Sequence, residues 1–282
     1  MSRRKRKVAD SFLYGLMVFA SVLVAASLVG IVVYILSQSA GMLRFSTVFG
    51  PGASSFLPMI VSTSLTVVTA LTLALPIGIM TAIYLNEYAL KSSQSRLIRL
   101  AIDTLAGIPS IVYGLFGLLL FVRIFNLGQS IAAGGLTLSI MILPVIIRTT
   151  EEALKTVPNT FREGSLSLGA TKFQTIVHAV LPPALPGILT AAILATGRVV
   201  GESAPVLLTV GIARYLPRTI FEPGRTLTIH LYYLTKEAVN PDDFALAFTA
   251  AAVLIILILI LNTLVKLIGL SLGGSRTGEN MD

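Results

Sequence analysis

Six long apolar runs occupy most of this chain and leave few ways for it to fold. A helix needs about 17 to 25 apolar residues to cross the hydrocarbon core of a bilayer. The runs cover residues 12–36, 57–84, 100–122, 131–147, 184–209 and 244–268. Because lipid offers the backbone no hydrogen bonds, continuous runs of this length favour helices over alternating strands. The sequence therefore predicts an all-α, polytopic membrane protein with six transmembrane helices.

Lys and Arg residues are spread unevenly over the segments between these runs. If the N-terminus is inside, most of the 21 basic residues lie on the cytoplasmic side, including a cluster at 3–7. Basic residues resist translocation, so this bias predicts cytoplasmic N- and C-termini in a cell (inner) membrane. It also accounts for the net charge of +8 without a nucleic-acid partner. The first apolar run is too long for the core of a cleavable signal and is interpreted as a retained helix.

The runs and their connections suggest three parts of the chain. Residues 1–56 hold the basic N-terminus, the first transmembrane helix and an external loop. Residues 57–270 form the membrane domain, which includes a polar cytoplasmic segment at 148–182. Residues 271–282 form a cytoplasmic tail.

Few residues are suited to catalysis or metal binding. The chain has no Cys, and its two His residues, His178 and His230, fall on opposite sides of the membrane in this topology. We therefore expect no catalytic residue, no metal site and no cofactor bound by this chain. The sequence also has no Gly-x-x-x-x-Gly-Lys-Ser/Thr loop, which cradles ATP phosphates in many ATPases. This chain is therefore not expected to bind ATP in that manner.

The cytoplasmic segment at 148–182 carries two patterns that mark the start of a helix. Thr160 with Glu163, and Thr171 with Gln174, both fit the Ser/Thr-x-x-Glu/Gln capping box. In such a box, two side chains satisfy amide groups that the first helical turn leaves unpaired. The two patterns predict a pair of short helices in this segment.

The predicted pair consists of a helix near 161–168 and a second near 172–181, with a glycine-permitted turn at Gly169 between them. Pro182 and Pro183 are expected to stop the second helix. A segment with such clear boundaries favours a rigid projection that contacts a partner. The alternative is an ordinary packed surface loop.

The same segment resembles a known signature. It reads Glu163-Gly164-Ser165, three residues, Gly169, nine residues, Ala179, one residue, Leu181-Pro182. The membrane subunits of binding-protein-dependent ABC importers carry Glu-Ala-Ala, three residues, Gly, nine residues, Ile, one residue, Leu-Pro. Gly164, Ser165 and Ala179 depart from that pattern. The resemblance implies a type I ABC importer permease fold and an ATPase-coupling role for Glu163, Gly164, Ser165, Gly169, Leu181 and Pro182.

Further stretches narrow the resemblance to the A-type permease subunits of phosphate-specific ABC importers. These are residues 76–79, 84–88, 107–117, 143–154 and 198–205, and the similarity extends over about 56–268. Such a resemblance implies import of inorganic phosphate by alternating access. The implied partners are a homologous second permease, two ATPase subunits and an extracytoplasmic phosphate-binding protein. A permease for another oxyanion, sulfate or molybdate, is the nearer alternative, and an integral membrane enzyme acting on lipid phosphates is a remote one.

Two charged residues, Arg198 and Glu202, lie inside the fifth apolar run. An isolated charge there costs about 2.5 to 3.5 kcal/mol on insertion scales, so a partner or a function is needed to offset it. Four residues apart on one helix, the two could form a structural ion pair. Alternatively they belong to the substrate pathway, where Arg198 binds a phosphate oxyanion and Glu202 orients or releases that arginine. We favour the second interpretation because phosphate permeases resemble this arrangement.

Overall fold

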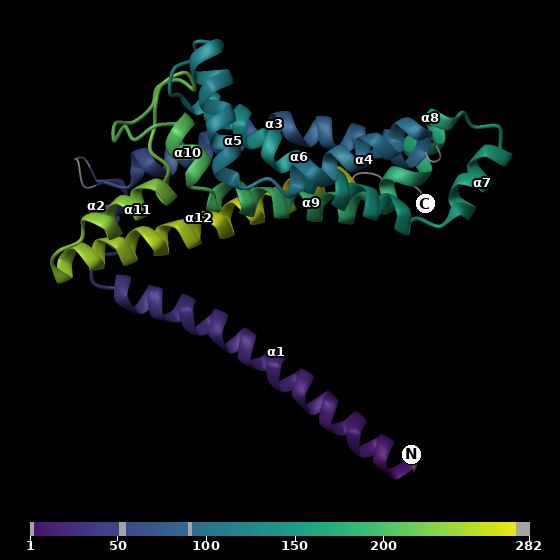
Figure 1. The fold of residues 1–282 in the computed structure, drawn as a ribbon, viewed down its shortest axis with the longest axis horizontal. Coiled ribbons are helices and arrows are strands. Elements are labelled where there is room, and N and C mark those ends of the chain that lie inside the picture. The colour runs from purple at the N-terminus through teal and green to yellow at the C-terminus, as the bar shows by residue number, and fades with distance from the viewer. Residues whose placement is uncertain (1–2, 51–54, 90–91, 275–282) are drawn as a thin grey trace.

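The computed structural model describes residues 3–50, 55–89 and 92–274, and every regular element within them is helical (Figure 1). The predicted all-α class is confirmed, whereas the predicted tail lies outside the described residues from residue 275 onward. The α-helices are α1 (Arg3–Ser39), α2 (Phe45–Phe49), α3 (Leu57–Ile83), α4 (Ser93–Ala106), α5 (Ser110–Gly117), α6 (Ile131–Thr156), α7 (Asn159–Ser167), α8 (Lys172–Thr175), α9 (Leu181–Gly201), α10 (Ala204–Thr209), α11 (Leu227–Glu237) and α12 (Pro241–Gly274). Three wider, π-helical segments are η1 (Tyr84–Tyr88), η2 (Leu118–Ile124) and η3 (Ile176–Val180).

Five segments within the described residues are long and apolar enough to cross a membrane. They are Phe12–Ser39, Leu57–Tyr88, Ile131–Thr156, Lys172–Gly201 and Pro241–Gly269. A sixth crossing follows if the helix pair Ser93–Ala106 and Ser110–Ile124 counts as one span, bent by 100°. The predicted number of crossings agrees with this arrangement.

The third crossing differs from the prediction of one helix over 100–122. It begins earlier, at Ser93, and breaks between Ala106 and Ser110. Pro109 lies at this break and precedes the first turn of α5. A proline has no amide hydrogen and disfavours helical conformation in the residue before it, so the chain turns here.

Four of the long helices, α3, α6, α9 and α12, lie along the long axis of the molecule (Figure 1). Helix α6 packs against both α3 and α9, and Leu138, Ile142 and Ile146 at its centre are fully buried. Gly78 lets α3 approach α6 closely, because a Cβ atom there would lie 2.6 Å from Ile146 Cγ2. Small residues of this kind allow tight packing between membrane helices.

Helix α1 stands apart from this bundle (Figure 1). Its spanning segment, Phe12–Ser39, is apolar but not buried against the rest of the chain. The C-terminal part of α1 contacts α12, where the rings of Tyr34 and Phe248 meet edge to face at 5.6 Å between centroids. The basic start of α1 lies at the same end of the molecule as α7 and α8 (Figure 1).

The segment predicted to be cytoplasmic forms a helical projection that we call the knob, comprising α7, α8 and η3 (residues 159–180). The predicted capping box at Thr160 is wrong, since α7 already begins at Asn159 and has no side-chain cap. The predicted box of Thr171 and Gln174 is confirmed, with both hydrogen bonds present at the start of α8. Gly169 makes the turn between them with φ of +83°, as expected.

The predicted stop at Pro182 and Pro183 is wrong. The chain continues from α8 through the wide turn η3 into α9, and the amide of Leu181 donates to the carbonyl oxygen of Ile176 five residues earlier. Pro182 and Pro183 thus fall in the first turn of α9. Prolines are tolerated there because the first turn of a helix needs no amide donors.

Candidate functional site

The charged pair in the fifth run lies at a helix end, not within a helix as predicted from the apolar run at 184–209. Helix α9 ends at Gly201, and Glu202 adopts an extended conformation with φ of −76° and ψ of 134°. Arg198 in the last turn of α9 still reaches Glu202, with 3.8 Å between Nε and Oε1. That distance is too long for a hydrogen bond. The two side chains are 37% and 17% exposed, so the guanidinium remains accessible.

Neighbouring elements hold the chain in place after Gly201. The hydroxyl group of Thr228 in α11 donates to the carbonyl oxygen of Glu202 at 3.1 Å. Helix α5 packs closely on the start of α10, since a Cβ atom at Gly114 would lie 2.8 Å from Pro205 Cα. The break at Glu202 is therefore fixed by contacts on two sides, which positions the carboxylate beside Arg198.

The other predicted site residues divide between the knob and the start of α9. Glu163, Gly164 and Gly169 are exposed on the knob. Ser165 is partly buried, and its hydroxyl group lies 3.0 Å from that of Thr175, which joins α7 to α8. Leu181 and Pro182 start α9, so the structure does not bring them into the exposed turn with Gly169. The six residues thus lie along one stretch of chain that runs from α7 through the turn at Gly169 to the start of α9.

The knob also exposes apolar side chains. Leu168 is 91% exposed and Phe173 is 69% exposed, and Phe161 and Leu166 are about half exposed. Clustered apolar side chains at a rigid turn are typical of a surface that contacts another protein. This supports the predicted partner contact.

The sequence did not reveal two ion pairs, one between the knob and η1 and one between α4 and α6. Arg162 of α7 pairs with Glu87 of η1, with 2.7 Å between Nη2 and Oε1. Arg99 of α4 pairs with Glu151 of α6. Glu87 and Glu151 are both buried, which makes their pairing with arginine necessary. For Glu87, the only signal in the sequence was a carboxylate placed just beyond the end of an apolar run. Its partner, Arg162, is 75 residues away along the chain.

A second charged cluster lies near the opposite end of the molecule. The Arg225 side chain is buried, donates from Nε to the carbonyl oxygen of Ile212 at 3.1 Å, and lies 4.7 Å from the centroid of the Tyr233 ring. Arg225 Nη1 is 3.4 Å from His230 Nδ1. Burial, and then the charges of Arg225 and Arg214, lower the pKa of His230 to about 4. His230 is therefore neutral at physiological pH and accepts a hydrogen bond from Arg225.

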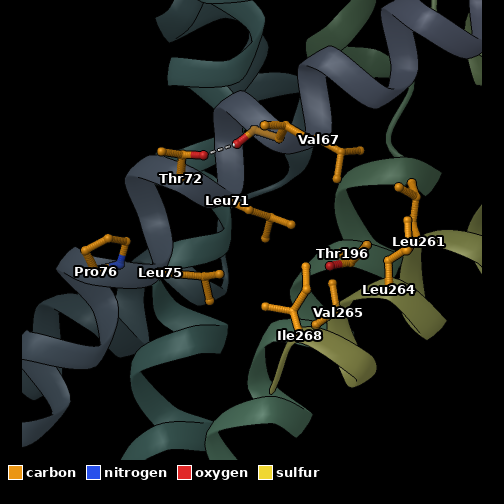
Figure 2. Close-up of a pocket in the computed structure, with 11 residues that line it drawn as sticks. Val67, Leu71, Thr72, Leu75, Pro76, Thr196, Leu261, Leu264, Val265 and Ile268 are labelled. Carbon is orange, nitrogen blue, oxygen red and sulfur yellow. Dashed lines mark hydrogen bonds between the residues drawn. The ribbon is translucent and has the colours of Figure 1, made fainter. Parts of the chain in front are cut away.

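A cavity of about 450 Å³ lies between α3, α9 and α12 (Figure 2). Its wall is almost entirely apolar and includes Val67, Leu71 and Leu264. The hydroxyl group of Thr72 donates to the carbonyl oxygen of Val68 at 2.7 Å, as Figure 2 shows, and that of Thr196 donates to its own helix. Both hydroxyl groups of the cavity wall are thus already engaged and poorly suited to bind an anion, which separates this cavity from the site at Arg198.

These features define a class of protein: a multi-pass helical membrane protein with an accessible arginine at a broken helix and a rigid projection at one end. The sequence matches the family described as "Binding-protein-dependent transport system inner membrane component" over residues 74–272. The chain belongs to this family.

Individual relatives agree with this assignment. The chain is 33% identical to a probable ABC transporter permease protein, YqgI, of Bacillus subtilis, over 94% of this chain and 96% of that protein. It is 41% identical to the phosphate transport system permease protein PstA 1 of Mycobacterium tuberculosis and 42% identical to PstA of Mycobacterium leprae, over 68% of this chain in each case. These two alignments span 63% and 62% of the mycobacterial proteins, less than two thirds of their length.

Solved structures confirm the predicted type I ABC importer permease fold. A chain of a bacterial ABC transporter that imports the acidic polysaccharide alginate superposes with a TM-score of 0.67 at 14% identity, over 95% of this chain and 98% of that chain. A chain of the MetNI methionine ABC transporter in an inward-facing conformation gives a TM-score of 0.57 at 22% identity, over 78% of this chain and 94% of that chain. At these identities the likeness is one of fold.

Proposed function

We propose that this chain is a permease subunit of an ATP-driven importer that moves inorganic phosphate across the cell membrane. The observation that carries the proposal is the accessible guanidinium of Arg198, which lies near the end of a membrane-spanning segment and is paired only loosely with Glu202. The names of the mycobacterial relatives support phosphate as the transported anion.

The residues suggest how an anion is bound and released. A guanidinium group presents paired N–H donors that match the oxygens of phosphate. In the absence of substrate, Glu202 balances the charge of Arg198 without a close hydrogen bond, so phosphate can replace the carboxylate at little cost. Transport proceeds by alternating access and involves no covalent chemistry on the anion.

The energy enters through the knob. Its exposed apolar residues and the positive-φ turn at Gly169 support contact with a cytoplasmic ATPase, in which Glu163, Gly164 and Ser165 take part directly. Leu181 and Pro182 connect this contact to α9. ATP is bound by the ATPase and not by this chain. The N- and C-termini then lie in the cytoplasm, and the start of α1 lies on the side of the knob.

The full assembly that we propose contains a homologous second permease, two ATPase subunits and an extracytoplasmic phosphate-binding protein. The accessible side of Arg198 then faces the second permease, and the loop between α10 and α11 meets the binding protein. A permease for sulfate or molybdate is the alternative, because both anions offer a guanidinium similar oxygens.

Uptake of radiolabelled phosphate by the reconstituted complex tests this function. Arg198→Gln should abolish most of the uptake while the complex still assembles, whereas Arg44→Gln, which alters an exposed arginine outside the loop between α10 and α11, should leave uptake unchanged. Excess sulfate and molybdate should fail to compete. Wild-type uptake by Arg198→Gln would remove the proposed role of this arginine, and competition by sulfate or molybdate would change the assigned anion.

A further inference from the structure

The guanidinium group of Arg162 uses its donors on two different elements. Nε donates to Glu87 Oε1 and Oε2 at 3.2 Å each, and Nη2 donates to Oε1 at 2.7 Å. The remaining donors reach the end of α6, where Nη2 and Nη1 bond the carbonyl oxygens of Leu154 at 3.0 Å and Val157 at 2.8 Å. One side chain of the knob therefore joins α7 to the end of α6 and to η1, the continuation of α3.

Glu87 is almost completely committed to this contact. Its side chain is 7% exposed and it also accepts a hydrogen bond from Asn86 Nδ2 at 2.8 Å. Hydrogen bonds between charged groups are among the strongest in proteins, and removal of one partner leaves a buried charge without compensation. The link between α7 and η1 is thus a rigid one.

The second limb of the knob contacts the same segment. The ammonium group of Lys172, the first residue of α8, lies 4.7 Å from the centroid of the Tyr88 ring. Arg99 of α4 donates from Nη2 to the carbonyl oxygen of Leu85 at 3.0 Å. Segment η1 is therefore held by both limbs of the knob and by α4.

The other end of α3 is joined to the neighbourhood of the anion site. The amide of Leu227 donates to the hydroxyl oxygen of Thr63 at 2.9 Å. Leu227 begins α11, and in the first turn of that helix the hydroxyl group of Thr228 donates to the carbonyl oxygen of Glu202. Helix α3 has 27 residues and is about 40 Å long, so it connects the knob to this site directly.

We propose that α3 is the lever of this permease and that Glu87 and Arg162 are positioning residues that transmit movement of the knob to it. The inference rests on the proposed function, because it assumes that a partner ATPase moves the knob. When that movement occurs, the clamp of Glu87 on Arg162 makes η1 and α3 follow. The contact of Thr63 with α11 then carries the shift toward Glu202.

A measurement of phosphate delivered per ATP hydrolysed tests the clamp in the reconstituted complex. Glu87→Gln keeps the shape of the side chain but removes its charge, and it should lower this ratio about fivefold or more. Asp103→Asn breaks an exposed ion pair with Arg148, which joins α4 to α6 and does not involve the knob, and should leave the ratio unchanged. A merely structural role for Glu87 would reduce the amount of complex without changing the ratio.

A second variant covers failure of Glu87→Gln to assemble. Tyr88→Ala removes an exposed ring from the contact with Lys172 and should also lower the ratio. If the wild-type complex transports phosphate and the assembled clamp variants retain its ratio, the lever is overturned while the proposed function stands. If the wild-type complex itself takes up no phosphate under ATP, the proposed function has failed.

Distance measurements provide a readout that does not depend on transport. Because the chain has no Cys, Ser167→Cys on α7 and Met80→Cys on α3 can be spin-labelled together without background from this chain, before it is assembled with its partners. In the complex, the distance between the labels should stay the same with and without ATP, whereas Glu87→Gln should broaden the distribution of distances. A label distance that changes with ATP in the wild-type protein as much as in the variant would overturn the proposal.

Discussion

Arg198 lies in the last turn of α9 and Glu202 lies immediately beyond it, so the two side chains meet across a helix end, at 3.8 Å. If α9 continued through Glu202, both side chains would lie on one face of the helix, one turn apart. Beyond Gly201, the position of Glu202 depends instead on the hydrogen bond between Thr228 and its carbonyl oxygen. The geometry of the proposed anion site therefore depends on the segment that carries α11.

The planar fork of Arg198 should matter more than its charge. Arg198→Lys keeps a positive group but replaces paired donors with one compact ammonium. Loss of one charge-assisted hydrogen bond, at about 1.5 to 3 kcal/mol, should reduce phosphate uptake about tenfold to hundredfold. Uptake by the reconstituted complex measures this, with Arg44→Lys, at an exposed arginine outside the loop between α10 and α11, as the control. An Arg198→Lys complex as active as the wild type would mean that charge alone suffices.

The turn of the knob should require glycine at position 169. Gly169 has φ of +83° and open space where a Cβ atom would lie, so Gly169→Ala adds backbone strain of about 1 to 2 kcal/mol and no clash. We expect weaker copurification of the ATPase and fewer phosphate ions per ATP. Gly169→Asn should be milder, because Asn tolerates this conformation.

Gly128 provides a matched control for this prediction. It has φ of +63° and equally open surroundings, but it lies in the loop before α6 and away from the knob. Gly128→Ala therefore adds similar strain without altering the surface of the knob. Equal effects of the two alanine substitutions on ATPase binding would show that the turn at Gly169 has no special role.

His230 should make the stability of the protein depend on pH. Its folded-state pKa of about 4 is lower than the ordinary value of 6.5, so the unfolded chain takes up a proton that the folded chain rejects. Stability should fall as the pH drops from about 6.5 toward 4, by on the order of 3 kcal/mol in total, and the effect should be absent above pH 7. Burial of the imidazole, and then the charges of Arg225 and Arg214, resist its protonation. The ring of Phe56 also faces His230, with 5.4 Å between the ring centroids.

His230→Asn isolates this effect, since its amide oxygen can still accept from Arg225 but does not titrate. The unfolding midpoints of the two purified proteins in detergent, measured between pH 7.5 and 4 in steps of about half a unit, should diverge only in the acidic part of that range. Carboxylates titrate in both proteins and cancel in the comparison. Parallel curves throughout would contradict the predicted role of His230.

Much of the fold could be predicted because membrane crossings depend on local composition. The apolar runs located the spans, and Gly169 and the box at Thr171 located the turn and the start of α8. Prolines were harder to interpret. Pro109 coincides with a sharp break, whereas Pro182 follows a wide turn and begins a long helix. Whether a proline breaks a helix or begins one depends on which backbone amides of the neighbouring turns already lack an acceptor. Composition alone does not give that information.

The contacts of the knob could not be predicted for another reason. Glu87 and Arg162 are 75 residues apart, and only the packing of α3 against α6 brings their segments together. The break after Gly201 was hidden because the apolar run continues through it to residue 209. The sequence identified Arg198 and Glu202 as a pair, but the structure was needed to show that a third element, α11, positions Glu202.

Two adjacent hydroxyl residues of α3 should respond differently to substitution. The hydroxyl oxygen of Thr63 accepts the amide hydrogen of Leu227 in a buried position. Thr63→Val keeps the shape of the side chain but leaves this amide without an acceptor, at a cost of about 1 to 3 kcal/mol. Ser62 Oγ is also buried, yet it finds no partner among the residues that the structure describes. Ser62→Ala removes a buried hydroxyl group that lacks such a partner, so it should not lower the unfolding free energy.

The variants Thr63→Val and Ser62→Ala also distinguish an effect on stability from an effect on the transmission of movement through α3. Since Thr63 joins α3 to α11, Thr63→Val should lower the unfolding midpoint in detergent and, in the assembled complex, also reduce phosphate delivered per ATP. Ser62→Ala changes the neighbouring position on the same helix and should lower neither quantity. If α3 acts as a lever, its contact with α11 is needed for movement to reach Glu202. A Thr63→Val complex that is less stable but delivers as much phosphate per ATP as the wild type would therefore show that this hydrogen bond acts only in folding.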